Sequence, residues 1–184
     1  GAKGRPAQLI FSSVYQLSEP GGNVDYNEIV ALADNRLVNE VIEVYCGDSY
    51  HGSRIVGTSH RFLDLYDAHL AIGRLWNRTY EVVMGSQAAA RQEAVVGDLI
   101  YVTHGTDGMG YTHEEFPFVV VGILKPTYSV MDKLVLTNLE SMWEIHSTDH
   151  TALEADNLQK REVTAALVKL NQKNGKMSLL RTIS

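Results

Sequence analysis

Residues 116–124 read FPFVVVGIL, the most hydrophobic stretch of strand length in the chain, and Lys125-Pro126 follows them. A short unbroken run of branched and aromatic apolar residues predicts a strand that is buried on both faces. The proline ends this strand, because it has no N–H group to continue a ladder of hydrogen bonds. We expect the core of this part of the molecule to form around the strand.

Shorter elements of both kinds surround this stretch in the sequence. Apolar or alternating runs predict further strands over residues 8–17, 39–45, 54–58, 81–84, 134–136 and 163–170. Helical spacing and capping residues predict helices over 23–37 with Asn23 as N-cap, over 61–66, after Ser86 as N-cap, and from the capping box at 137–140 to residue 145. The order of these elements predicts the α+β class, as a split βαββαβ sandwich with an inserted β-rich subdomain.

The composition is that of a folded globular protein. Of the 184 residues, 45% are hydrophobic and 21% are charged, which is more apolar than a disordered chain. The net charge of -6 and the scattered basic residues argue against a nucleic-acid partner. The single cysteine, Cys46, excludes an internal disulfide but not an oxidising compartment.

Membrane and targeting segments are not evident in the sequence. No run approaches the roughly 18 apolar residues of a membrane span, and no signal peptide precedes the first expected strand. The chain also starts at Gly1 and not at a methionine. The chain is therefore expected to be either a cytosolic protein or a fragment of a larger one, and the start at Gly1 favours the fragment.

Several short motifs occur in a fixed order between residues 54 and 146. They are RIVGT at 54–58, GR at 73–74, EVVMGS at 81–86, VGD at 96–98, FVVVGILKPT at 118–127 and WEIH at 143–146. In this combination the chain resembles the periplasmic core of MacB/FtsX-type ABC transporter permeases. It departs from that pattern at Tyr128, where a glycine is usual, and at Thr137-Asn138-Leu139, where a proline-containing step is usual.

The resemblance implies a split architecture. A Porter-like subdomain would comprise residues 1–79 and 151–184, and a Sabre-like subdomain of residues 80–150 would be inserted into it. The domain would lie in the periplasm, between the first and second of four membrane helices of the full permease. No catalytic residue and no cofactor would be expected, because the ATPase of such systems is a separate subunit or domain.

The resemblance also implies partners and a mode of action. A cytoplasmic ABC ATPase would act through the membrane helices, and two permease copies would form the working dimer. A periplasmic adaptor or binding protein would be a further partner. ATP hydrolysis would then do mechanical work on the far side of the membrane, by a rigid element with two arrangements.

A glycine-rich stretch at residues 105–110, GTDGMG, is expected to form a hairpin tip. It contains neither a Walker lysine nor the glycine spacing of a dinucleotide site, so it predicts no nucleotide cofactor. Exposed loops often carry binding residues. The candidate partner-contact residues of this tip are Thr106, Asp107, Met109 and Tyr111.

Four of the seven histidines are weak candidates for a metal site. His146 and His150 are four residues apart, and His104 and His113 flank the glycine-rich stretch. Neither pair has a third ligand at a diagnostic spacing, so we expect surface histidines and no metal. The periplasmic domain of a zinc-handling transporter remains the first alternative function.

A hydrolase is the second alternative. Gly47-Asp48-Ser49 follows an apolar strand, as the nucleophile does in GDS-type esterases. Such an enzyme needs a late Asp-x-x-His pair, in which His is the base and Asp orients it. The only such pair here, Asp48 to His51, overlaps the candidate nucleophile. We therefore expect a polar hairpin turn over residues 47–52, a buried Cys46, and no enzymatic activity.

Overall fold

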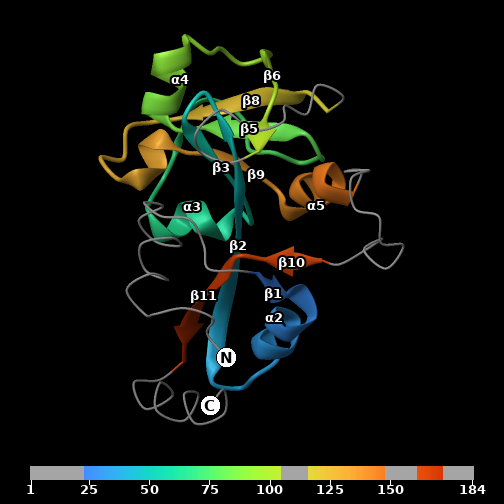
Figure 1. The fold of residues 1–184 in the computed structure, drawn as a ribbon. Helices are drawn as coiled ribbons and strands as arrows, with labels where there is room; N and C mark the ends of the chain where they lie inside the picture. Colours follow the sequence, from blue (N-terminus) through green and yellow to red (C-terminus); the bar gives the residue numbers. More distant parts are fainter. Residues whose placement is uncertain (1–22, 105–115, 148–160, 172–184) are drawn as a thin grey trace. The chain divides into compact units, whose positions relative to one another are not determined.

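The computed structural model describes residues 23–104, 116–147 and 161–171 (Figure 1). The chain divides into two compact units: unit 1 comprises residues 1–44 and 160–184, and unit 2 comprises residues 45–159. Both units consist mainly of strands, and helices lie between successive strands along the chain. This arrangement confirms the α+β class.

Unit 1 contains a short helix held between strands. The strand β1 (Val24–Asp25) leads directly into α2 (Tyr26–Ala33) and pairs antiparallel with β10 (Glu162–Val163). The expected N-cap Asn23 is wrong: the side chain of Asp25 caps the helix by accepting the N–H of Asn27 at 2.8 Å. Asn23 precedes the strand and instead donates to the carboxylate of Glu162 at 3.0 Å.

The long strand β2 (Val38–Tyr50) extends further than the sequence predicts. A strand over 39–45 and a polar turn from Gly47 onward were expected, but the last residues of β2 remain in the ladder and pair antiparallel with β7 (Thr103–His104). The chain reverses only at His51-Gly52, where φ is 44° and 77°. Both values lie in the left-handed region that a two-residue hairpin turn requires.

The residues of β2 are divided between the two units. Residues 38–44 belong to unit 1, where they pair antiparallel with β11 (Ala165–Leu170), and residues 45–50 belong to unit 2. The strand expected over 163–170 is therefore present as β10 and β11. The strand expected over residues 8–17 lies outside the described residues.

The described strands of unit 2 form one sheet. Their order is β2, β3 (Ser53–Thr58), β9 (Val135–Thr137), β5 (Glu81–Met84), β8 (Phe118–Leu124) and β4 (Leu70–Gly73). The pairs β3–β9 and β5–β8 are parallel, whereas β5–β9 and β8–β4 are antiparallel. The short strand β6 (Leu99–Ile100) also pairs with β8. The apolar stretch FPFVVVGIL therefore forms an interior strand, as predicted.

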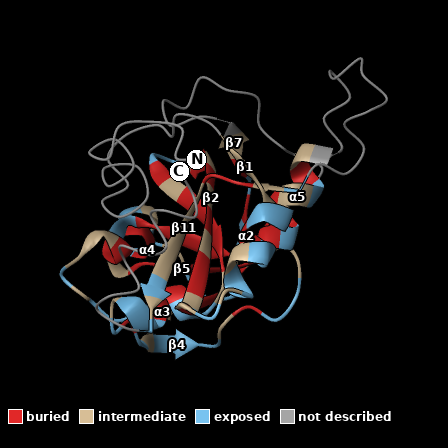
Figure 2. Cartoon of the chain, turned by 90° about the horizontal axis from the view of Figure 1, so that it is seen from below, coloured by how far each residue is buried: buried red, intermediate tan, exposed pale blue. Residues whose placement is uncertain are grey.

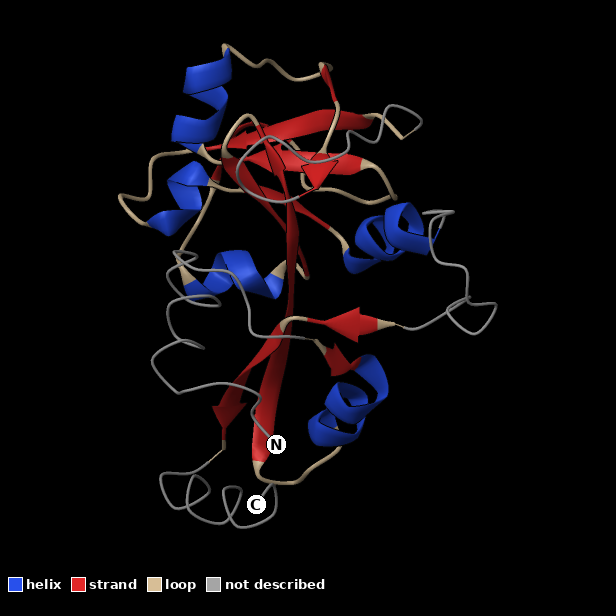
Figure 3. Ribbon diagram, viewed as in Figure 1, coloured by secondary structure: helices blue, strands red, loops and turns tan. Residues whose placement is uncertain are grey.

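Helices join the strands of unit 2 (Figure 3). They are α3 (Arg61–Leu65), α4 (Ser86–Gln92), the 3-10 helix η2 (Val130–Lys133) and α5 (Leu139–Ser147). Within the described residues no helix is long and apolar enough to cross a bilayer.

The start of α4 differs by one residue from the expectation. Gly85, and not Ser86, occupies the N-cap position. A Cβ atom at residue 85 would lie 2.1 Å from the carbonyl oxygen of Met131, so only glycine fits where the backbone of η2 approaches. The hydroxyl of Ser86 donates a hydrogen bond to the carboxylate of Asp132 in η2.

The apolar core of unit 2 is built from the middle strands and the helices beside them. Its fully buried members include Ile55, Val82, Met84, Phe118, Val120, Val135, Met142 and Ile145. In β8, Val120 and Leu124 are buried, whereas Val119 and Ile123 are only half-buried. The edge strand β4 is largely exposed, as its pale blue colour in Figure 2 shows.

The compact units do not begin and end at the boundaries that were expected for the Porter-like subdomain (1–79 and 151–184) and the Sabre-like subdomain (80–150). Those subdomain boundaries stay a prediction. The glycine-rich tip at 105–110 lies outside the described residues.

Candidate functional site

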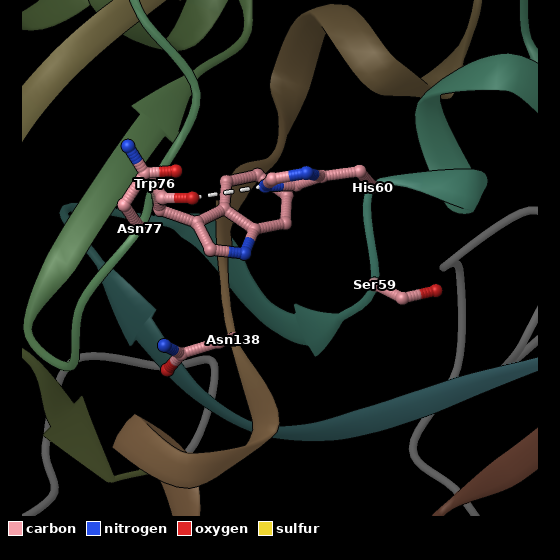
Figure 4. A pocket seen from close by; sticks show the side chains of 5 residues that line it. All are labelled: Ser59, His60, Trp76, Asn77 and Asn138. Carbon is pink, nitrogen blue, oxygen red and sulfur yellow. Dashed lines mark hydrogen bonds between the residues drawn. The ribbon is translucent and has the colours of Figure 1, made fainter.

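A polar pocket of about 340 Å³ lies in unit 2 where three connections meet (Figure 4). Ser59 and His60 follow β3, Trp76 and Asn77 lie between β4 and β5, and Asn138 lies between β9 and α5. Among the described residues, no Asp, Glu, Lys or Arg side chain lines this pocket. None of these residues was singled out as a site residue from the sequence.

His60 and Trp76 form one wall of the pocket. The Nε2 atom of His60 lies 3.0 Å from the main-chain oxygen of Trp76. A carbonyl oxygen only accepts, so Nε2 must carry the hydrogen of this bond. The two ring centroids are 4.6 Å apart in an edge-to-face arrangement. Trp76 is only 4% exposed, so the wall is held firmly in place.

A buried carboxylate fixes the segment that carries Trp76 and Asn77. Glu81 is 8% exposed and receives a hydrogen bond of 2.7 Å from Arg74, together with the main-chain N–H groups of Asn77 and Arg78 at 2.8 and 3.3 Å. The hydrogen bond from Arg74 is the main reason why the pKa of Glu81 is lowered to about 2, against the opposing effect of burial. Glu81 therefore stays ionised and closes the loop between β4 and β5.

Asn138 is oriented by the first turn of α5. Its Oδ1 atom accepts the main-chain N–H of Ser141 at 2.9 Å, which makes Asn138 the residue that caps this helix. The expected capping residue, Thr137, is displaced from that role because its hydroxyl donates to the main-chain oxygen of Glu81 at 2.8 Å. A tertiary contact thus decides between two adjacent residues that both favour the N-cap position.

The pocket offers hydrogen-bond donors. Because Oδ1 of Asn138 is occupied, its Nδ2 group is left for other partners, and it forms no hydrogen bond to the described residues. The same holds for the indole Nε1 of Trp76. Neutral donors suit a carbonyl or hydroxyl oxygen better than a charged group.

The structure also brings together Asp48 and His146, which belonged to separate candidate sites in the sequence analysis. The Nε2 atom of His146 in α5 lies 3.0 Å from Oδ2 of Asp48 in β2, and the ring of Tyr45 packs on the imidazole with centroids 5.5 Å apart. The backbone of His104 pairs with Asp48 across β2 and β7. This cluster was missed because its members converge only through the sheet topology.

The four candidate metal ligands divide into two groups. The imidazole of His146 lies beside the carboxylate of Asp48, His104 is placed only by its backbone pairing with Asp48, and His113 and His150 lie outside the described residues. Among the residues that the structure describes, no three His, Cys, Asp or Glu side chains are grouped to hold a metal ion. The metal interpretation of these histidines stays a prediction.

The structure describes the candidate nucleophile Ser49 but not the candidate partner contacts. Ser49 is 2% exposed inside β2, and Cys46 is 5% exposed. A nucleophile must be reached by substrate, so neither position suits catalysis in this arrangement. The tip residues Thr106, Asp107, Met109 and Tyr111 lie outside the described residues.

A family model described as the MacB-like periplasmic core domain matches residues 3–174 of the chain. None of the curated proteins matches the sequence.

Solved structures of low sequence identity share the fold. The extracellular domain of the noncanonic ABC-type transporter YknZ from Gram-positive bacteria is 13% identical with a TM-score of 0.55, over 95% of this chain and 83% of that one. The periplasmic region of MacB from Actinobacillus actinomycetemcomitans is also 13% identical, with a TM-score of 0.57 over 88% of this chain and 73% of that one. At this identity the likeness concerns the fold alone.

Proposed function

The chain belongs to the family of MacB-like periplasmic core domains, and we propose that it couples ATP-driven movement of a membrane permease to a periplasmic substrate or partner. The resemblance that the motifs between residues 54 and 146 indicated is confirmed by this membership. The domain is periplasmic, and the permease family implies an ATPase partner through the full-length protein.

The long strand β2 is the observation that carries the proposal. It runs for 13 residues and contributes to both compact units. In unit 1 it is hydrogen-bonded to β11, and in unit 2 to β7. A strand whose residues belong to both units is a continuous segment along which movement of one unit would pass to the other.

A binding and transmitting role also suits the chemistry of unit 2. His146 and Asp48 approach each other, but Ser49, the candidate nucleophile next to Asp48 in the sequence, is buried in β2. Among the described residues that line the pocket near Asn138, no general base is hydrogen-bonded to a nucleophile, because the Nε2 atom of His60 is bonded to the main-chain oxygen of Trp76. We therefore propose that the domain binds or moves a partner and does not catalyse a reaction.

The experiment uses the full permease with its ATPase, reconstituted in lipid nanodiscs. In a Cys46→Ser background, spin labels are attached to Arg91→Cys, an exposed position on α4. The proposal predicts that the distance between the labels of two permease copies changes between the nucleotide-free and the ATP-trapped states. The same distance distribution in both states would show that ATP does not move this domain.

A further inference from the structure

The connection between β8 and β9 is anchored by a buried carboxylate. Asp132 is 1% exposed, and its Oδ1 atom accepts the main-chain N–H and the hydroxyl of Thr127 at 2.7 and 2.8 Å. Its Oδ2 atom accepts the N–H of Tyr128 at 2.9 Å. Burial alone would raise the pKa of Asp132, but these bonds and one from Ser86 hold the pKa below its usual range. The charged carboxylate therefore fixes the loop.

The anchored loop presents one aromatic side chain to solvent. Tyr128 is 95% exposed, the highest value among the exposed large hydrophobic residues of the described chain. Its φ angle is 55°, in the left-handed region that residues with a Cβ atom adopt at a cost of about 1 kcal/mol. This conformation explains why glycine is usual here in the family. A tyrosine gains no burial in exchange for the strain.

Two lysines accompany the tyrosine on the same connection. Lys125 and Lys133 are both exposed, and neither forms an ion pair within the part of the chain that the structure describes. Lys133 directly follows Asp132, whose carboxylate holds the backbone of Tyr128. Lys125 lies three positions before Tyr128 and Lys133 five positions after it, in a chain whose net charge is -6.

We propose that Tyr128 is the anchor residue of a docking surface for an acidic segment of a partner protein. The ring would insert into the partner, because exposed aromatic side chains on a rigid support lose little conformational entropy and often dominate binding. Lys125 and Lys133 would attract the acidic residues around that contact and set the rate of association. This inference rests on the proposed role in partner coupling and identifies the surface that serves it.

The first part of the test separates binding from folding. In Tyr128→Gly the left-handed conformation is no longer strained, so the midpoint of urea unfolding should stay the same or rise. Binding by this variant should nevertheless fall, which a merely structural role for Tyr128 would not produce. A clear decrease in the unfolding midpoint would show that the tyrosine serves the fold and would overturn the proposal.

The second part identifies the partner in the full permease within membranes. The photo-reactive residue p-benzoylphenylalanine is placed at position 128 and, as a control, at the position of Tyr101, which is 44% exposed. The cross-links from position 128 should map to an acidic segment of another protein, and their yield should fall at least about fivefold in Lys125→Glu with Lys133→Glu. Adducts only with lipid, only with a second permease copy, or with a yield unaffected by the charge reversal would overturn the inference.

The third part measures affinity with a defined probe. A fluorescent peptide that copies the cross-linked segment should bind the chain at least about fivefold more weakly after Tyr128→Gly, and within about twofold after Tyr101→Gly. Equal effects of the two substitutions would contradict an anchor at Tyr128. If the labels at Arg91 move with ATP while position 128 forms no protein cross-link, the docking surface is wrong and the coupling function stands.

Discussion

The imidazole Nε2 atom of His146 lies 3.0 Å from Oδ2 of Asp48, although 98 positions separate the two residues in the chain. The side chain of Asp48 is fully buried, and that of His146 is 24% exposed. The contact joins the last turn of α5 to the end of β2. The contact therefore fixes α5 to β2, the strand on which the proposed function depends.

This contact predicts a difference between two His–Asp pairs. His146→Ala should lower the free energy of unfolding by about 1–3 kcal/mol, because the buried carboxylate of Asp48 loses a donor. His69 and Asp67 are 3.1 Å apart, but their side chains are 69% and 94% exposed. His69→Ala should therefore change the free energy of unfolding by less than about 0.5 kcal/mol. Urea unfolding at neutral pH measures both. Equal losses of unfolding free energy in the two variants would mean that the burial of Asp48 does not strengthen its contact with His146.

The ion pair of Arg74 and Glu81 predicts a dependence of stability on pH. The pKa of Glu81 falls from an ordinary 4.5 to about 2 on folding. A depressed pKa contributes stability that is fully present above pH 4.5 and is lost as the pH falls toward 2. Glu81→Gln should therefore destabilise the protein by up to about 3 kcal/mol at pH 6, and by progressively less below pH 4.5. Thermal unfolding of both proteins from pH 6 to pH 2.5 tests this, and a difference that does not shrink with falling pH would contradict it.

The interior position of β8 predicts which substitutions damage unit 2. Leu124 is 1% exposed, so Leu124→Ala should cost about 2–4 kcal/mol through lost burial and an unfilled cavity. Lys125 is the next residue and is exposed, so Lys125→Ala should change stability by less than about 0.5 kcal/mol. Denaturant titration measures both values. A loss below about 0.5 kcal/mol for Leu124→Ala would show that this strand does not organise the core.

The zinc-handling alternative makes a prediction of its own. We expect no submicromolar zinc site, because such sites take three or four ligands and the contact of Asp48 with His146 supplies two. Calorimetry on chelator-treated protein should therefore show micromolar or weaker binding. A submicromolar site with one ion per chain, lost in His146→Ala together with His150→Ala, would promote the metal-handling function.

Much of the fold could be predicted because its signals are local. The stretch FPFVVVGIL is apolar enough to be an interior strand wherever it lies, and the alternation after Val163 required a strand. The cap of α5 could not be decided locally, because Thr137 and Asn138 both favour that position. The structure decides it through the main-chain oxygen of Glu81, which takes the hydroxyl of Thr137.

The sites were much harder to predict than the fold. His146 lies 3.0 Å from Asp48 because the strand order of the sheet brings their elements together. Trp76 and Asn138 line one pocket for the same reason. Sequence spacing carries no trace of such contacts. One signal was available: a tyrosine stands at position 128 where the family pattern has glycine, and a residue that breaks a backbone rule points to a special conformation.

The proposed function requires that movement passes from one compact unit to the other along β2, whose residues belong to both units. In the reconstituted full permease, two glycines are inserted between Val44 and Tyr45, where the residues of β2 pass from unit 1 to unit 2. An insertion of two residues preserves the alternation of side chains and softens the strand. A matched control carries the same insertion between His51 and Gly52, in the hairpin turn.

The quantity measured is the ATP-dependent change in the distance between spin labels at Arg91 in the two permease copies, with ATP hydrolysis recorded in parallel. The insertion after Val44 should leave hydrolysis intact and reduce the distance change to less than about half of the control, because a flexible β2 no longer transmits the movement. A distance change as large as that of the control would show that the movement does not pass along β2.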